Sequence, residues 1–206
     1  MTTKTKFVCW LAVMASLAVI PGCWTYSLHP LYEANDPHRL YDPELEGKWE
    51  TGDSDCAACI LAITGDAPSL SYTFEFVDPS KKKCDCATDD SPVPRYEGRV
   101  LQLGPGRFLD ATPIGDAAGQ GYMAAHNLFK IKVDRHSLLL MPASDDWLCA
   151  NAKPEIGECI EGDFIFTSQT SVLQDFIQAH AGDDGLFPKP NPGDGLRRVE
   201  ETGGSK

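Results

Sequence analysis

Three pairs of short segments, each pair joined by a tight turn, follow one another through the middle of the chain. Apolar and polar residues alternate in these segments, or an apolar run is bounded by turn formers, as in β-strands. The pairs are 59–64 with 70–77, 96–103 with 107–111, and 127–133 with 137–141, and a last short strand is expected at 164–168. Strands at this spacing without helices between them predict a mainly β fold, an antiparallel meander that forms a barrel-like structure or a sandwich.

One C-terminal α-helix is expected after the last strand. Apolar residues between 172 and 177 recur at helical spacing, Gly182 ends the pattern, and Ser171 and Gln174 have the spacing of a capping box. The segments at both ends of the domain are polar and rich in turn formers. The predicted organisation is a signal peptide at 1–22, a lipidated N-terminus and extended tether at 23–45, a β-rich globular domain at 46–187 and a disordered tail at 188–206.

The first 22 residues have the order of a secretory signal. Lys4 and Lys6 precede an apolar run from 7 to 20, and the small residue Gly22 stands directly before Cys23. A helix that spans a bilayer needs roughly 20 apolar residues, so a run of this length predicts a cleaved signal and not an anchor.

Cys23 points to covalent attachment to a membrane. The sequence Ile20-Pro21-Gly22-Cys23 resembles the lipobox of bacterial lipoproteins. This resemblance implies that Cys23 is acylated and becomes the mature N-terminus, and two or three acyl chains hold a protein firmly to a bilayer. Trp24, in place of Asp, follows the cysteine, which by resemblance to the sorting rule of enteric bacteria favours the outer membrane over the inner membrane.

The segment after Cys23 carries a second resemblance. His29-Pro30-Leu31-Tyr32, followed by residues 42–49 with Gly47 and Trp49, looks like the opening of a family of small uncharacterised bacterial lipoproteins. That family has no established activity, so the resemblance implies an envelope protein and assigns no catalytic residue.

The Gly47-x-Trp49 motif, the meander and the late helix together resemble the lipocalin type of barrel, in which the tryptophan closes one end. This resemblance implies a carrier for a small apolar ligand. The side chains that would line its interior cavity are Trp49, Phe74, Phe76 and Phe108. The alternative is that Trp49 is a core residue of some other β fold.

The charge of the chain excludes one class of partner. The net charge is −12, and it becomes −14 without residues 1–22, which hold two lysines and no acidic residue. An acidic surface repels phosphate backbones, so nucleic acid is not an expected partner, whereas a membrane is expected through the lipid anchor.

Six cysteines remain after Cys9 is removed and Cys23 is acylated, and an even number in an exported protein favours disulfides. Cys149 and Cys159 flank a loop with Pro154 and Gly157, and we expect them to be joined. Cys56, Cys59, Cys84 and Cys86 would come together at one end of the first hairpin. These four are candidates for two disulfides, for a zinc site or for a redox-active pair.

No motif for catalysis or for a cofactor is present in the sequence. His126, His136 and His180 lack the spacing of metal ligands, and the pairs 145–146 and 183–184 lack that of a calcium loop. We therefore expect no enzyme and no cofactor. The leading hypothesis is a lipid-anchored envelope protein with a structural or binding role, and the rivals are the apolar-ligand carrier and a thiol-disulfide oxidoreductase.

Overall fold

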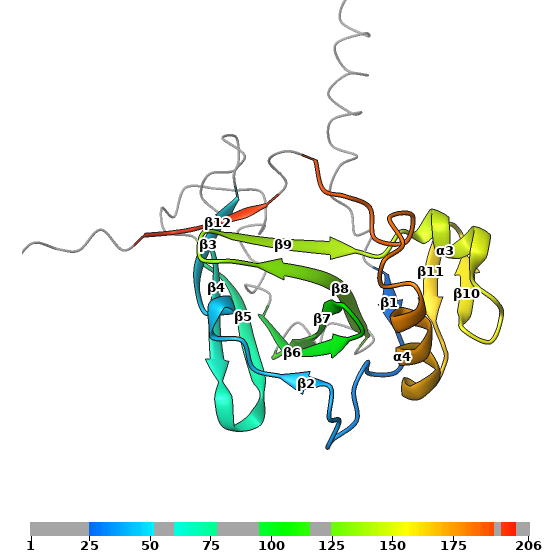
Figure 1. Ribbon diagram of the computed structural model, residues 1–206, viewed down its shortest axis with the longest axis horizontal. Coiled ribbons are helices and arrows are strands. Elements are labelled where there is room, and N and C mark those ends of the chain that lie inside the picture. Colours follow the sequence, from blue (N-terminus) through cyan, green and yellow to red (C-terminus); the bar gives the residue numbers. More distant parts are fainter. Residues whose placement is uncertain (1–24, 52–59, 78–94, 116–124, 192–194, 201–206) are drawn as a thin grey trace, which may run out of the picture.

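A computed structural model describes residues 25–51, 60–77, 95–115, 125–191 and 195–200 (Figure 1). Twelve strands within these ranges form one continuous sheet. Eight of them curl into a closed antiparallel barrel, which confirms the mainly β, barrel-like prediction.

Seven barrel strands form a meander, and an eighth closes it. The seven are β3 (Gly47–Thr51), β4 (Ile60–Asp66), β5 (Ser71–Val77), β6 (Arg95–Leu103), β7 (Gly106–Ile114), β8 (His126–Val133) and β9 (Ser137–Pro142). The predicted hairpins correspond to β4–β5, β6–β7 and β8–β9 and are confirmed by their pairing. β12 (Leu196–Arg198) lies between β9 and β3 and pairs with both, so the barrel has no open seam.

The interior of the barrel is filled by alternate side chains of its strands. On β6 and β7, for example, Val100 and Leu109 point inward, whereas Leu101 and Phe108 point outward. The buried interior cluster comprises Leu45, Trp49, Leu61, Ile63, Tyr72, Phe74, Val100, Leu109, Ala111, Phe129, Ile131 and Leu138. The first of these, Leu45, belongs to a short 3-10 turn, η2 (Pro43–Leu45), that leads into β3.

A second apolar core lies between the outer face of the barrel and a layer of short elements (Figure 1). That layer contains β1 (Tyr26–Ser27), α3 (Asp145–Asn151), β10 (Gly157–Ile160), β11 (Asp163–Phe166) and α4 (Thr170–Ala179). β1 pairs antiparallel with β8 and parallel with β11, so it continues the barrel sheet into the outer layer. Lys130 of β8 donates from Nζ to the carbonyl oxygen of Ala181 at 2.5 Å, which links the turn after α4 to the barrel.

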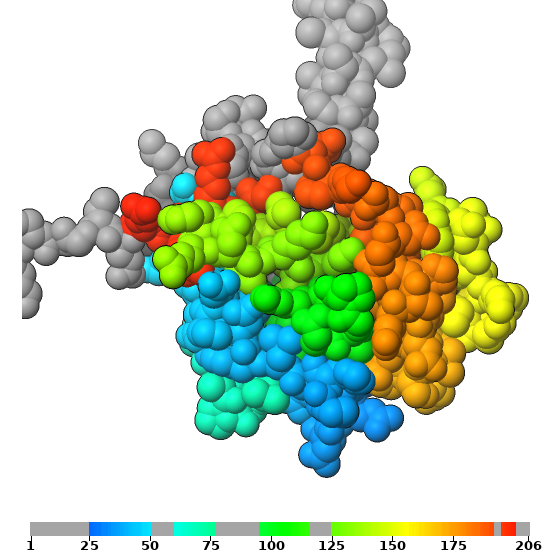
Figure 2. Space-filling model, in the orientation of Figure 1, coloured from blue at the N-terminus to red at the C-terminus, as the bar shows by residue number. Residues whose placement is uncertain are grey.

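The tether predicted at 23–45 is wrong for residues 25–45. These residues form β1, β2 (Arg39–Leu40) and η2. β2 pairs with the end of β6. Figure 2 shows residues 25–45 packed on the body of the protein. Thr25, Ser27 and Leu31 are at most 1% exposed. The polar residues and turn formers predicted an extended segment, because the few apolar residues that are buried here do not recur at a regular spacing.

The disordered tail predicted at 188–206 is wrong for residues 196–198, which form β12. Leu196 packs against the interior cluster, so a three-residue strand is held by burial and by two neighbouring strands. The folded body thus extends beyond the predicted limits of 46–187 at both ends.

The helix predicted after the strand at 164–168 is confirmed as α4, which follows β11, but its predicted capping box is wrong. Gln169 is the N-cap, but its side chain makes no capping hydrogen bond. Gln174 instead donates to the carbonyl oxygen of Leu31 at 2.7 Å. A second helix, α3, was not expected. Its first turn is capped by Ser144, whose Oγ accepts from the backbone N–H of Trp147 at 3.3 Å.

Candidate functional site

One end of the barrel is closed by Trp49 and Arg198. Trp49 is fully buried and donates from Nε1 to the carbonyl oxygen of Leu45 at 2.9 Å. The guanidinium of Arg198 lies 4.2 Å from the centroid of the indole, within the range of a cation–π contact. The burial predicted for Trp49 is confirmed, and its partner is a residue that sequence reasoning had placed in the tail.

Arg198 also joins three segments through backbone carbonyls. Its Nε donates to Arg135 at 2.8 Å, Nη1 to Glu46 at 2.6 Å and Nη2 to Glu44 at 2.5 Å. One side chain thus connects β12, the β8–β9 turn and the segment that enters β3. The pair Arg197-Arg198 was visible in the sequence, but nothing local indicated that the second arginine turns inward.

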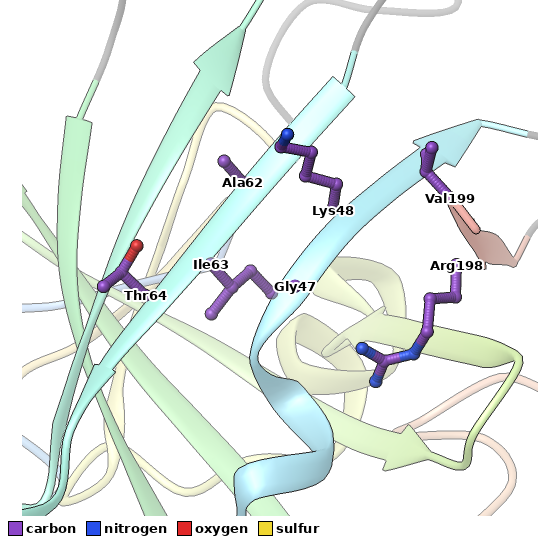
Figure 3. A pocket seen from close by; sticks show the side chains of 7 residues that line it. All are labelled: Gly47, Lys48, Ala62, Ile63, Thr64, Arg198 and Val199. Atoms are coloured by element: carbon purple, nitrogen blue, oxygen red, sulfur yellow. The ribbon is translucent and has the colours of Figure 1, made fainter. Parts of the chain in front are cut away.

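A hollow of about 370 Å³ opens on the outer surface beside this closure (Figure 3). It lies between β3, β4 and the end of β12, and it is lined by Gly47, Lys48, Ala62, Ile63, Thr64, Arg198 and Val199. Gly47 has a φ of +132°, and a Cβ there would come within 2.5 Å of Nη1 of Arg198. Nε, Nη1 and Nη2 of Arg198 each bond a backbone carbonyl, so the guanidinium beside the hollow is held in place by the closure.

The four aromatic residues predicted to line a ligand cavity do not share one space. Trp49 and Phe74 lie in the interior cluster, at 0% and 4% exposure, and Phe76 packs against it. The prediction is wrong for Phe108, which faces outward. Its ring centroid lies 5.4 Å from that of Phe187 in the outer core. Leu109, one residue further along β7, takes the inward position, since neighbours on a strand face opposite sides.

The outer face of the barrel holds a buried acid–histidine pair. Asp110 is 1% exposed, and its Oδ1 lies 2.7 Å from Nδ1 of His126. A carboxylate can only accept, so Nδ1 is the donor, and Oγ1 of Thr112 lies 3.1 Å from the same nitrogen. Sequence reasoning missed this pair because the residues are sixteen positions apart and meet only through the β7–β8 pairing, which sets Ala111 opposite Asn127.

The same carboxylate holds the His29–Tyr32 segment against the barrel. Oδ2 of Asp110 accepts from the backbone N–H of Leu31 at 2.6 Å, and Leu31 itself is fully buried. Tyr32 packs edge-on to His126, with ring centroids 6.4 Å apart, and the guanidinium of Arg99 lies 5.0 Å from its centroid. Burial is the main cause that raises the pKa of Tyr32 above its ordinary value.

The chemistry open to this pair is limited. Within the described ranges no side chain hydrogen-bonds Nε2 of His126, and Thr112 contacts the nitrogen that already faces the carboxylate. A nucleophile, a base and an orienting carboxylate in series would need the hydroxyl on the other nitrogen. Asp110, which bonds both His126 and the N–H of Leu31, thus holds the N-terminal segment against the barrel.

The disulfide predicted between Cys149 and Cys159 is present and links α3 to β10. Cys56, Cys59, Cys84 and Cys86 lie outside the described residues, as does Cys23. The strand ends next to these segments are neighbours, however, because Ile60 pairs with Glu50 on one side and with Val77 on the other. The connections that contain the four cysteines therefore leave the barrel at the same end.

Two features are absent from the described residues. Nowhere among them do three or more His, Cys, Asp or Glu side chains gather as a metal ion would require. None of the helices in this part of the chain has the length and apolarity needed to cross a bilayer.

No family model matches the chain, and neither the curated proteins nor the solved structures contain a match to it. The residues of this chain are therefore the basis for a functional proposal.

Proposed function

We propose that this protein is a lipid-anchored component of the bacterial cell envelope, held by acyl chains on Cys23, with a barrel that serves a structural or binding role and no catalytic one. The order of Lys4, Lys6, the apolar run, Gly22 and Cys23 supports export and acylation. Trp24 favours the outer membrane as the destination. The proposed partners are the membrane itself and a protein or small apolar ligand not yet identified.

The observation that carries the structural or binding role is the solid interior of the barrel. Trp49, Val100 and Leu138 have no surface that a water-sized sphere can touch. At Gly98 an added Cβ would lie 2.5 Å from the ring of Phe74 and 2.8 Å from Leu109, so even a methyl group does not fit there. An eight-stranded barrel is just wide enough to be filled by its own side chains. A partner would therefore meet the outer surface.

The anchor is tested by replacing Cys23 with Ser. We expect the variant to lose membrane attachment, because the acyl chains supply nearly all of the affinity for the bilayer. The measurement is the fraction that sediments with membranes after a salt wash, together with the intact mass of the natural protein. A variant in which Cys149 and Cys159 are both replaced by Ala is the matched control and should stay attached. Full attachment of the Cys23→Ser protein would refute the proposal.

A carrier of a small apolar ligand is the second candidate. Because the interior is filled, its ligand would bind to the partly buried apolar side chains at the edge of the interior cluster, among them Phe76, Tyr96 and Leu140. Native mass spectrometry of protein extracted gently from its own membrane tests it. A retained lipid-like mass that decreases in Phe76→Ser, with Phe108→Ser as the outward-facing control, would support the carrier over the structural role.

A further inference from the structure

The first described residue of the chain is fixed in the body of the protein. Thr25 is 1% exposed, and its Oγ1 donates to the carbonyl oxygen of Ala143 at 2.9 Å and lies 3.3 Å from Oδ1 of Asp145. The next two residues form β1, where Tyr26 is opposite Asn127 on one side and Ile165 on the other. Thr25 therefore moves with the barrel and not with a flexible segment.

Only one residue separates Thr25 from the proposed acylation site. Successive Cα atoms are about 3.8 Å apart, so the Cα of Cys23 lies within about 8 Å of that of Thr25. A fully extended segment over 23–45 would reach roughly 75 Å, and a flexible one would average roughly 25 Å. The folding of residues 25–45 onto the barrel removes that reach.

We propose that the acylated protein has no tether and that its body rests directly on the bilayer. The inference depends on the acylation of Cys23 proposed above and adds to it the face that meets the lipid. This face surrounds the point where the chain enters the body at Thr25, and it contains the connection from β9 to α3 and the start of β11. The occupant is a lipid headgroup surface, which the short chain between Cys23 and Thr25 brings to this face and to no other.

The residues of this face follow from the hydrogen bonds of Asp145. Its Oδ1, which lies beside Thr25, also accepts from the backbone N–H of Phe164 at 3.0 Å, so the start of β11 lies next to the anchor. Asp146 and Asp163 are exposed neighbours on the two segments that meet here. Because both side chains are charged and accessible, they report contact between this face and a membrane.

Carboxyl footprinting tests which face meets the lipid. The acylated protein in vesicles of phosphatidylethanolamine and phosphatidylglycerol, and the soluble Cys23→Ser variant, are each treated with a carbodiimide and glycine ethyl ester. Modification is measured by peptide mass spectrometry. We expect Asp146 and Asp163 to be modified several-fold less on vesicles. Glu33, which is exposed in the connection between β1 and β2 at the lower edge of Figure 1, should be modified equally in both. Equal modification of Asp146 in the two samples would overturn the inference.

Neutron reflectometry on a supported bilayer of the same lipids tests the missing tether. We expect no water layer between the bilayer and the natural protein. A variant with twelve Gly and Ser residues inserted after Trp24 should open a layer of roughly 20 Å, the average reach of such a linker. A layer of equal thickness in both proteins would show that the N-terminal segment leaves the body. Failure of the natural protein to bind the bilayer would instead refute acylation, so the two failures are distinguishable.

Discussion

At the scale of single residues, polar side chains connect segments that short strands alone would hold with few hydrogen bonds. Arg198 is the last residue of a three-residue strand, yet it contacts the indole of Trp49 and three carbonyl oxygens. Asp110 likewise fixes both His126 and the N–H of Leu31. Because such contacts join residues far apart in the sequence, neither could be predicted from local patterns, whereas the burial of Trp49 could.

Replacement of Arg198 by Met tests this role. Met keeps an apolar stem over the indole but removes the charge and the three donors, so the free energy of unfolding should fall by about 2–3 kcal/mol. Urea unfolding gives the measurement. Arg197→Met is the matched control, since Arg197 is exposed, and its effect should stay within about 0.5 kcal/mol. An equal decrease in the free energy of unfolding in the two variants would contradict a stabilising role for the contacts of Arg198.

The hydroxyl of Tyr72 predicts a loss of stability at alkaline pH. Burial, the largest cause, raises its pKa from the usual 10.0 to about 12. The folded state thus keeps a proton that the unfolded chain loses. The contribution of this hydroxyl to the free energy of unfolding is therefore intact below pH 10 and is lost as the pH rises towards 12. The titrating hydroxyl is the one that bonds Asp42. Since one pKa unit corresponds to about 1.4 kcal/mol, the free energy of unfolding should fall by about 1–2 kcal/mol by pH 11.5.

Unfolding of the natural protein and of Tyr72→Phe, measured at intervals from pH 9 to pH 11.5, tests this contribution. Phe lacks the titrating group, so the variant should be less stable at pH 9 but should lose less on going to higher pH. The gap between the two proteins should therefore narrow. A gap that stays constant across this range would rule out Tyr72 as the source.

At the scale of elements, the sequence predicts those that have a period and misses those held by burial alone. The three hairpins carry alternation over several residues each, and α4 carries an apolar stripe, so both kinds were predictable. β1, β2 and β12 contain two or three residues, too few to show a period. α3, with seven residues, is shorter than helices that form unaided, and its capping by Ser144 and its buried Leu148 depend on the finished fold.

The disulfide between α3 and β10 was predictable because both cysteines flank one short loop. In the chain-entropy account, closing a loop across ten positions stabilises the fold by roughly 2.5–3 kcal/mol. Replacement of Cys149 and Cys159 together by Ala should lower the free energy of unfolding by that amount. Under reducing conditions the difference between the two proteins should vanish, and its persistence there would point to packing and not to the crosslink.

At the scale of the whole molecule, the barrel is a closed structure whose last strand comes from the far end of the chain. β12 separates β3 from β9, so the seven strands of the meander alone would leave two free edges. The alternation of the hairpins predicts a curved antiparallel sheet but not its closure, because closure depends on three residues that resemble a tail. This dependence makes the C-terminus part of the core and not an appendage.

Truncation after Gly195 tests the closure. Loss of β12 removes two strand pairings, the packing of Leu196 and the contacts of Arg198 together, so the free energy of unfolding should fall by at least about 3 kcal/mol. The freed edges of β3 and β9 should also pair between molecules, since unpaired strands are templates for association. Urea unfolding and light scattering measure the two effects. Truncation after Glu200 keeps β12 and is the matched control, which should remain as stable and as monodisperse as the full chain. If the protein truncated after Gly195 is as stable and as monodisperse as the one truncated after Glu200, the other seven strands form the barrel without β12.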